Sequence, residues 1–302
     1  MSLYGIPYMG SKTGIAEDLI AILPKGERFV DLFGGGFAMT HCALLSSKWK
    51  SFLYNEINPL LVELIRKGIN GDYNYDKFKP EFITREKFAE LKDVDGYVKY
   101  IWSFGNKGDA YLFGKDIEEQ KHAFHDAVVF GKMDKACEYI PELKNMRGRT
   151  IKDRRLSYNI IVRGELQRND LQQLQQLERL QQLEQLERLQ QLERLERLQQ
   201  LERLELVCGS YLDFAYGKGD VVYCDPPYEG TAEYDGGFNH KEFYDWVASR
   251  PYRVYFSSYE ISDKRFFRVW EKRKLSTLSG SSNRAERVEV LYSNQEDRIT
   301  LF

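Results

Sequence analysis

The chain has 302 residues, 42% of them hydrophobic and 14% aromatic, which is enough apolar material for one large domain or two modest ones. Its 44 basic and 46 acidic residues give a formal net charge of -2 and a pI near 6.2, so the average charge shows no sign of a nucleic-acid binder. No apolar run approaches the roughly 18 residues of a membrane helix, and the start lacks a signal-peptide pattern. We therefore expect a soluble, cytoplasmic protein.

The chain begins with an alternation of strands and helices. We predict a strand at 28–33, a helix at 38–47, a strand at 51–55 and a helix from Asn58. A second region of this kind starts near Leu204 with a short strand and continues with a strand at 220–224, a helix at 240–248 and a strand at 252–257. The alternation predicts a parallel sheet covered by helices. Two last strands, at 287–292 and 298–302, predict a terminal hairpin.

The four cysteines are far apart in the chain. They are Cys42, Cys137, Cys208 and Cys224, with no C-x-x-C pair and no clustering with the four histidines. We therefore expect four reduced, mostly packed thiols and neither a zinc site nor a disulfide framework.

Residues 71–170 lose the alternation and are predicted to form an inserted domain. Its segment 144–168 holds eight basic residues against two acidic ones, an excess of six positive charges. Such a segment is typical of a phosphate-binding surface. The aromatic residues at 102–108 and 111–115 belong either to the core of this domain or to a wedge that enters a DNA duplex.

Residues 171–204 repeat the triplet L-x-x, with twelve leucines spaced three apart. A period of three turns the leucine position by about 60° per triplet on an α-helix, so the leucines wind around the helix and do not form a coiled-coil seam. Leu, Gln, Glu and Arg are strong helix formers, which favours a helix over a stacked solenoid. We interpret the repeat as an insertion whose length can vary without affecting the chemistry.

The most specific motif is Asp225-Pro226-Pro227-Tyr228, which directly follows a predicted apolar strand. The prolines end the strand and stiffen the turn, so a carboxylate, a carbonyl and an aromatic ring project together at the edge of the sheet. An exocyclic amine on a flat heterocycle can donate to Asp225 and to the Pro226 carbonyl while Tyr228 stacks on its ring.

A second motif joins an acid to a glycine turn. Strand 28–33 carries Asp31 and leads into Gly34-Gly35-Gly36, which permit close approach of a ligand. Glu56 follows the next strand, where nucleoside-binding folds hold ribose hydroxyls.

With these motifs the chain resembles the Dam-like family of DNA adenine-N6 methyltransferases, S-adenosylmethionine enzymes of the α motif order. Segment 7–12 (PYMGSK) looks like the family's amino-terminal cofactor motif, and segment 208–213 (CGSYLD) is similar to the one before the catalytic strand. The resemblance implies a Rossmann-like, mostly parallel methyltransferase sheet in a catalytic domain formed by 1–70 and 204–302. A target-recognition domain at 71–170 and the repeat insertion at 171–204 would separate its halves.

The resemblance also implies roles for individual residues. Those assigned to S-adenosylmethionine are Tyr8, Gly10, Lys12, Asp31, Phe33, Gly34, Gly35, Glu56, Ile57 and Asp225, with Tyr211 and Asp213 as weaker candidates. Catalysis is assigned to Asp225, Pro226, Pro227 and Tyr228, and DNA binding to Lys144, Arg147, Arg149, Arg154 and Arg155. Phe37 departs from the family's F-x-G-x-G turn, because it stands where the last glycine is usual; a positive φ there would be unfavourable for it.

We therefore expect a bacterial or phage-encoded enzyme that transfers a methyl group to N6 of a flipped adenine in double-stranded DNA, with or without a restriction endonuclease partner. The alternatives are an RNA base methyltransferase and a catalytically idle DNA-binding or assembly protein. Cytosine N4 is a weaker alternative, since that activity usually has Ser in place of Asp225. The net charge of -2 is no objection, because residues 171–206, with seven Glu and five Arg, account for all of it.

Overall fold

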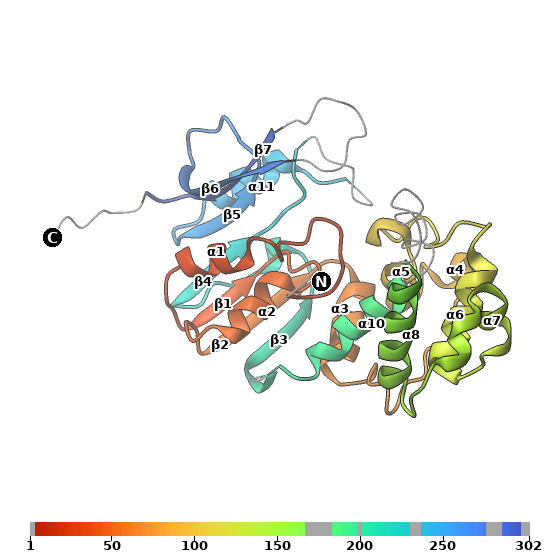
Figure 1. Ribbon diagram of the computed structural model, residues 1–302. Coiled ribbons are helices and arrows are strands. Elements are labelled where there is room, and N and C mark those ends of the chain that lie inside the picture. Colours follow the sequence, from red (N-terminus) through yellow and green to blue (C-terminus); the bar gives the residue numbers. More distant parts are fainter. Residues whose placement is uncertain (1–3, 167–182, 199–200, 230–236, 276–285, 297–302) are drawn as a thin grey trace. The chain divides into compact units, whose positions relative to one another are not determined.

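The computed structural model describes residues 4–166, 183–198, 201–229, 237–275 and 286–296. The chain divides into two compact units. The sheet unit consists of Met1–Ile6, Gly10–Val62 and Leu198–Phe302, and the helical unit of Pro7–Met9 and Glu63–Arg197. Figure 1 labels the elements of both units.

The described strands form one seven-stranded sheet in the order β3-β2-β1-β4-β5-β7-β6 (Figure 1). They are β1 (Arg28–Asp31), β2 (Ser51–Glu56), β3 (Leu204–Cys208), β4 (Asp220–Cys224), β5 (Val254–Ser258), β6 (Phe267–Leu275) and β7 (Glu286–Ser293). The first five strands pair in parallel, whereas β7 runs antiparallel to both β5 and β6. The predicted α/β class with a mostly parallel sheet is confirmed.

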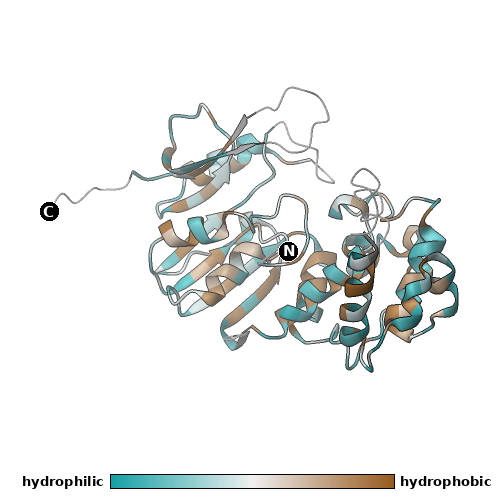
Figure 2. Cartoon of the chain, in the orientation of Figure 1, coloured by the Kyte–Doolittle hydropathy of each residue, from teal (hydrophilic) through white to brown (hydrophobic). Residues whose placement is uncertain are grey.

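The sheet unit buries apolar side chains against its helices, which are α1 (Ala16–Ile22), α2 (Ala38–Leu45) and α11 (His240–Ala248). Because strand side chains alternate between faces, Val30 and Val222 point to one face, where they join a core that includes Phe243 of α11. Figure 2 shows the apolar segments along these strands. The face that carries Val30 and Val222 is therefore covered, as parallel strands require.

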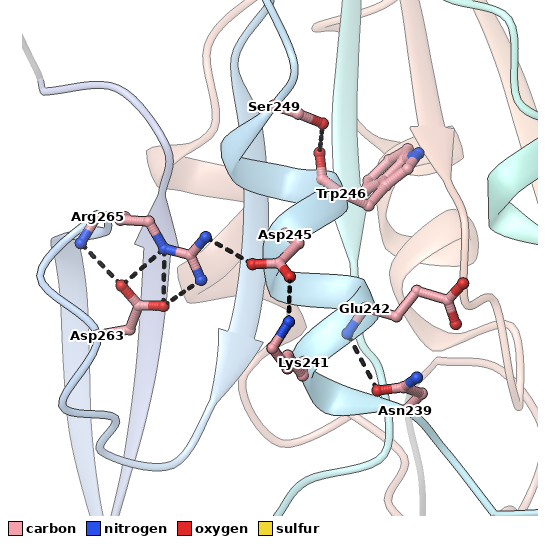
Figure 3. A network of polar contacts seen from close by, with 8 residues as sticks. All are labelled: Asn239, Lys241, Glu242, Asp245, Trp246, Ser249, Asp263 and Arg265. Carbon is pink, nitrogen blue, oxygen red and sulfur yellow. Dashed lines mark hydrogen bonds and ion pairs between the residues drawn. The ribbon is translucent and has the colours of Figure 1, made fainter.

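Polar contacts fix both ends of α11 (Figure 3). Asn239 caps its start by accepting the Glu242 N–H, and the Ser249 hydroxyl donates to the Trp246 carbonyl at its end. Arg265, just before β6, donates to Asp245 of α11 and to Asp263. These contacts hold the helix and the chain entering β6 together.

Most predicted elements of the sheet unit occur within one or two residues of their predicted bounds, and 220–224 and 240–248 match β4 and α11. The predicted last strand, 298–302, lies outside the described residues. The antiparallel neighbour of β7 on the outer side is β6, which the sequence analysis did not predict. Strand β6 carries several exposed charged residues, including Arg268, Lys272 and Arg273, as edge strands often do, and its apolar residues do not alternate regularly along it.

The helical unit is built from short helices. Its α-helices include α4 (Arg85–Leu91), α5 (Gly96–Ile101), α6 (Glu118–Phe130), α7 (Asp134–Tyr139), α8 (Ile151–Leu166) and α10 (Glu184–Leu195), and the division between the units falls within α3 (Pro59–Ile69). The 3-10 turns are η1 (Phe104–Asn106) and η2 (Pro141–Asn145) here, with η3 (Leu201–Arg203) and η4 (Tyr211–Asp213) in the sheet unit.

Helix α10 comes from the leucine repeat and lies inside the helical unit. Leu186, Leu189, Leu192 and Leu195 are all 0% exposed, although a period of three spreads them over about half of the helix circumference. Neighbours therefore cover the helix on several sides: Arg155 donates to the Leu186 carbonyl at 3.1 Å, and Lys152 pairs with Glu193 at 2.6 Å. Of the repeat at 171–204, residues 184–195 form the predicted helix, 201–203 form the 3-10 turn η3 and Leu204 begins β3, while 171–182 and 199–200 lie outside the described residues.

The four cysteines are free thiols in the structure; Cys42 and Cys224 are buried, whereas Cys137 is half-buried and Cys208 exposed, so only two of the four thiols are packed inside. Among the described residues, no helix combines the length and the apolar character that crossing a membrane requires.

Candidate active site

The strand order brings two acidic residues to one edge of the sheet. The order changes direction between β1 and β4, because the chain continues from β1 to β2 on one side and reaches β4 on the other only much later. Asp31 ends β1 in register with Tyr223, and Asp225 follows β4 directly. Open parallel sheets bind ligands in the crevice at such a point.

Lys12, Asp225 and Tyr228 lie together at this edge. The Lys12 ammonium is 2.8 Å from Asp225 Oδ1 and 4.7 Å from the centroid of the Tyr228 ring. The Tyr228 hydroxyl donates to the same Oδ1 at 3.1 Å. Lys12 is only 6% exposed, so its charge is paired in a largely dry environment. The structure thus joins two motifs that are far apart in the sequence.

Glu289 of β7 completes this group, although the sequence analysis did not single it out. Its carboxylate accepts a short hydrogen bond from the Tyr228 hydroxyl and lies 3.5 Å from the Lys12 ammonium. It is 4% exposed. The available signal was a lone acid between Val288 and Val290 in an apolar strand. We call Lys12, Asp225, Tyr228 and Glu289 the Lys12 cluster.

Within the described part of the chain, the Lys12 cluster places two carboxylates beside the Lys12 ammonium. Burial raises the pKa of Asp225; Lys12 lowers it, and the charge of Glu289 raises it again. Burial also raises the pKa of Tyr228 well above its ordinary value, so its hydroxyl remains a hydrogen-bond donor at neutral pH. His240 Nε2 lies 2.9 Å from the Pro227 carbonyl, which helps to fix the motif's backbone.

Asp31 has one satisfied and one unsatisfied oxygen. Its Oδ2 accepts from the Thr40 hydroxyl at 2.8 Å, whereas its Oδ1 is buried without a hydrogen-bond partner in the described part of the chain. Burial raises the pKa of Asp31 to about 7, and the charges of Asp225 and Glu56 add to the shift. A buried carboxylate oxygen without a hydrogen-bond partner is suited to accept a hydrogen bond from a cationic ligand.

The glycine turn after β1 packs closely against β2. A Cβ on Gly34 would stand 2.1 Å from the Tyr54 ring, so only glycine fits there. Gly35 has a φ of 46° and donates its N–H to Glu56 at 3.0 Å. Glu56 also accepts from the Asn58 N–H at 3.0 Å, which fixes both of its oxygens. Burial raises its pKa and these backbone donors oppose that shift.

Phe37 does adopt the left-handed conformation that the sequence analysis identified as unfavourable. Its φ is 69° and its ψ 12°, and it is the residue before the first turn of α2. The ring is 0% exposed and lies 5.3 Å from that of Tyr54, centroid to centroid. The backbone of the glycine turn is therefore retained, and the bulky side chain is accommodated in the core.

The remaining cofactor candidates of the sheet unit lie around the ends of β1, β2 and β3. Ile57 is 72% exposed and the Phe33 ring is 5.1 Å from that of Tyr211. Asn55, which the sequence analysis missed, donates to the Leu32 and Gly209 carbonyls and so ties these strand ends together. Residues lining a nearby cavity of about 230 Å³ include Asn55, Gly209, Ser210 and Asp213.

The family model of the D12 class N6 adenine-specific DNA methyltransferases matches residues 8–250, which is most of the chain and includes the Lys12 cluster apart from Glu289. The chain belongs to this family. It is therefore an enzyme that methylates adenine N6 in DNA, as the sequence motifs predicted. Among curated proteins, none is similar enough to this methyltransferase to count as a relative.

Two cofactor candidates of the methyltransferase, Tyr8 and Gly10, are two residues apart in sequence but belong to different units. Gly10, in the sheet unit, has a φ of 77°, and its carbonyl accepts from Lys12 at 3.4 Å. Tyr8 belongs to the helical unit, where its ring lies 5.6 Å from that of Tyr100. A role of Tyr8 at the cofactor stays a prediction.

The five basic candidates of the methyltransferase's helical unit divide into two kinds. Arg154 donates to the Val128 and Val129 carbonyls at the end of α6, and Arg155 donates to the Leu186 carbonyl and the Gln190 side chain. Both guanidinium groups thus stabilise the unit. The other three candidates are exposed: Lys144, Arg147 and Arg149. DNA binding by any of the five stays a prediction.

Proposed function

We propose that this methyltransferase binds S-adenosylmethionine at the carboxyl ends of β1 and β2 and methylates an adenine held by Asp225, Pro226 and Tyr228. The observation that carries the proposal is the convergence of Asp225 and Tyr228 at the same sheet edge as Asp31. When bound, the cofactor supplies an electrophilic methyl group on a sulfonium. Everything else required of the site is binding, orientation and charge.

The residues present fit this cofactor. The unpartnered Asp31 Oδ1 would accept from its ammonium group. Glu56 would give up its hydrogen bond from the Gly35 N–H and accept hydrogen bonds from the ribose hydroxyls instead. The exposed Ile57 side chain would cover the adenine ring. Gly34 and Gly35 would allow the methionine portion to approach the backbone.

Cofactor binding is expected to release a proton near pH 6. Asp31, with a pKa of about 7, is mostly protonated there, and an ammonium at Oδ1 would favour its ionised form. Calorimetry in two buffers of different ionisation enthalpy measures the release, which should fade above pH 8 as Asp31 is then already ionised. Asp31→Asn should abolish it, whereas Asp213→Asn should retain it. A release that persists undiminished in Asp31→Asn would exclude Asp31 as its source.

The target adenine would donate its amino hydrogens to the Asp225 carboxylate and the Pro226 carbonyl. These acceptors draw the nitrogen lone pair out of conjugation and toward the methyl group, while Tyr228 stacks on the base. Lys12 lies over the Tyr228 ring and on Asp225 Oδ1, so a base that used this ring face and this oxygen would have to displace it. The base must also leave the duplex, and stacking worth about 1–3 kcal/mol would offset the few kcal/mol that flipping costs.

One assay tests the activity and its alternatives. Labelled S-adenosylmethionine is incubated with duplex DNA, single-stranded DNA and RNA, and the modified base is identified. We expect N6-methyladenine in duplex DNA. Transfer to RNA alone would favour an RNA methyltransferase, and no transfer to any substrate would favour an idle binding protein.

We further propose that the helical unit recognises the target DNA. Its aromatic residues divide as the two sequence hypotheses allowed: Trp102, Tyr111 and Phe113 are buried, whereas Phe104 is 68% exposed. Phe104 N donates to the Ala110 carbonyl beside a bridge between Ser103 and Tyr111, so it projects from a tight loop. An exposed aromatic ring on such a loop is suited to wedge between bases.

Replacing Lys144 and Arg149 together with alanine is expected to weaken DNA binding at low salt. Each lost phosphate contact should reduce the slope of log K against log salt by about 0.9, so the pair should reduce it by roughly two. Fluorescence anisotropy over a salt series measures both quantities. Both side chains are exposed, so thermal unfolding should not change. An unchanged affinity and slope would place the DNA surface elsewhere. Arg154 is a poor choice for this test, since its loss would also destabilise α6.

A further inference from the structure

Two hydrogen-bond donors in the Lys12 cluster are shared between two carboxylates. Asp225 Oδ1 receives the Lys12 ammonium at 2.8 Å and the Tyr228 hydroxyl at 3.1 Å. The same two donors reach Glu289 Oε1, Lys12 at 3.5 Å and Tyr228 through a short hydrogen bond. Each donor can therefore shift from one carboxylate toward the other without leaving the cluster.

We propose that Glu289 is a positioning residue for methyl transfer, which takes over Lys12 and keeps the Tyr228 hydroxyl when the target amine binds to Asp225. The proposal rests on the proposed function of Asp225 and Tyr228. Both donors contact the same Asp225 oxygen, Oδ1, so an amine that binds this oxygen has to compete with them. Glu289 lowers the cost of that exchange, because the buried ammonium keeps an anion within reach.

Glu289 would also set the orientation of the Tyr228 ring. The ring is held at its hydroxyl by Glu289 and at its edge by Tyr259, whose ring centroid is 4.8 Å away at an interplanar angle of 78°. A ring fixed at two points offers a defined face for stacking. A misplaced base would lose the alignment of its amine with the methyl group, and small misplacements of this kind lower rates by about 10- to 100-fold.

The charge of Glu289 has a second, measurable effect on Asp225. The titratable groups that act on or adjoin Asp225 come from several elements: Lys12 before α1, Asp31 of β1, Tyr223 and Cys224 of β4, Tyr228 of the motif and Glu289 of β7. Among these, the negative charge of Glu289 raises the pKa of Asp225 and Lys12 lowers it. Removing the charge of Glu289 should thus lower the pKa of Asp225 and leave Lys12 bound to it more firmly.

Glu289→Gln tests the proposal. We expect kcat to fall about 10- to 100-fold, the affinity for S-adenosylmethionine to change by less than about threefold, and the acid limb of the pH–rate profile to move to lower pH. Glu271→Gln is the matched control, because Glu271 is an exposed residue of the adjacent strand β6 opposite Val290. It should resemble the wild type. Glu289→Asp keeps the charge and should retain the wild-type acid limb with a partial loss of kcat.

A second measurement does not depend on activity. The carbon-13 resonance of the Asp225 carboxyl, assigned by its loss in Asp225→Asn, should titrate at lower pH in Glu289→Gln than in wild type. An unchanged kcat, or a reduced kcat with an unmoved acid limb and an unmoved Asp225 titration, overturns the proposal and leaves Glu289 a structural residue. A wild-type enzyme that titrates as expected but never methylates adenine would instead contradict the proposed function.

Discussion

Asp225→Ala is expected to reduce methyl transfer by about 10²- to 10³-fold while the protein stays folded. The variant removes the carboxylate that would accept the target amine, and losing one such preorganised polar contact lowers kcat by about 10²- to 10³-fold. The fold should survive, because Lys12 keeps Glu289 at 3.5 Å. Single-turnover methylation of duplex DNA measures the rate, and circular dichroism checks the fold.

Two further variants separate the parts of this effect. Asp225→Asn keeps a carbonyl acceptor without the charge, so it should retain more activity than alanine. Glu229→Gln changes an exposed carboxylate next to the motif and should have near-normal turnover. Binding of S-adenosylmethionine should persist at least partly in Asp225→Ala. Near-normal turnover in that variant would remove Asp225 from its assigned role.

The position of the Asp225–Tyr228 motif beside Asp31 could be predicted because its information is local. Prolines end β4 at Cys224 and place Asp225 directly after it, and a glycine turn follows Asp31. Each feature is specified by a few adjacent residues, and parallel pairing then brings both to one edge of the sheet. The same reasoning predicted φ > 0 as the unfavourable case at Phe37, and that case is found.

Glu289 and the arginines show what the sequence could not provide. Glu289 joins the site only because β7 pairs antiparallel with β5, and no local pattern specifies that partner. A count of basic residues likewise cannot distinguish Arg154, which holds carbonyls at the end of α6, from the exposed Arg149. The arrangement of the helical unit was difficult to predict from the sequence for the same reason. Its helices are held together by long-range contacts, such as the hydrogen bond from Arg188 to the Ile101 carbonyl.

At position 37, glycine is expected to be a more stable replacement than alanine, which is the opposite of the usual order of stability. Phe37→Ala removes a wholly buried ring and should destabilise the protein by about 3–5 kcal/mol. Phe37→Gly loses the same ring but also relieves a left-handed conformation that costs an L-residue about 1–2 kcal/mol. The extra flexibility of glycine in the unfolded chain offsets part of this gain, about 0.4–1 kcal/mol. Glycine should therefore be the more stable replacement by roughly 0.5–1 kcal/mol.

Phe52 of β2 provides the matched control, since it is 1% exposed and sits in an extended strand. There, Phe52→Gly should be less stable than Phe52→Ala by about 0.5–1 kcal/mol, which reverses the order at Phe37. Urea denaturation of the four variants measures both differences. Alanine more stable than glycine at both positions would mean that the left-handed conformation of Phe37 carries no strain. Glycine more stable than alanine at position 37, with alanine more stable than glycine at position 52, would show that the glycine turn of this methyltransferase is strained at Phe37. The Phe37 ring, which packs beside Tyr54, would then compensate for that strain.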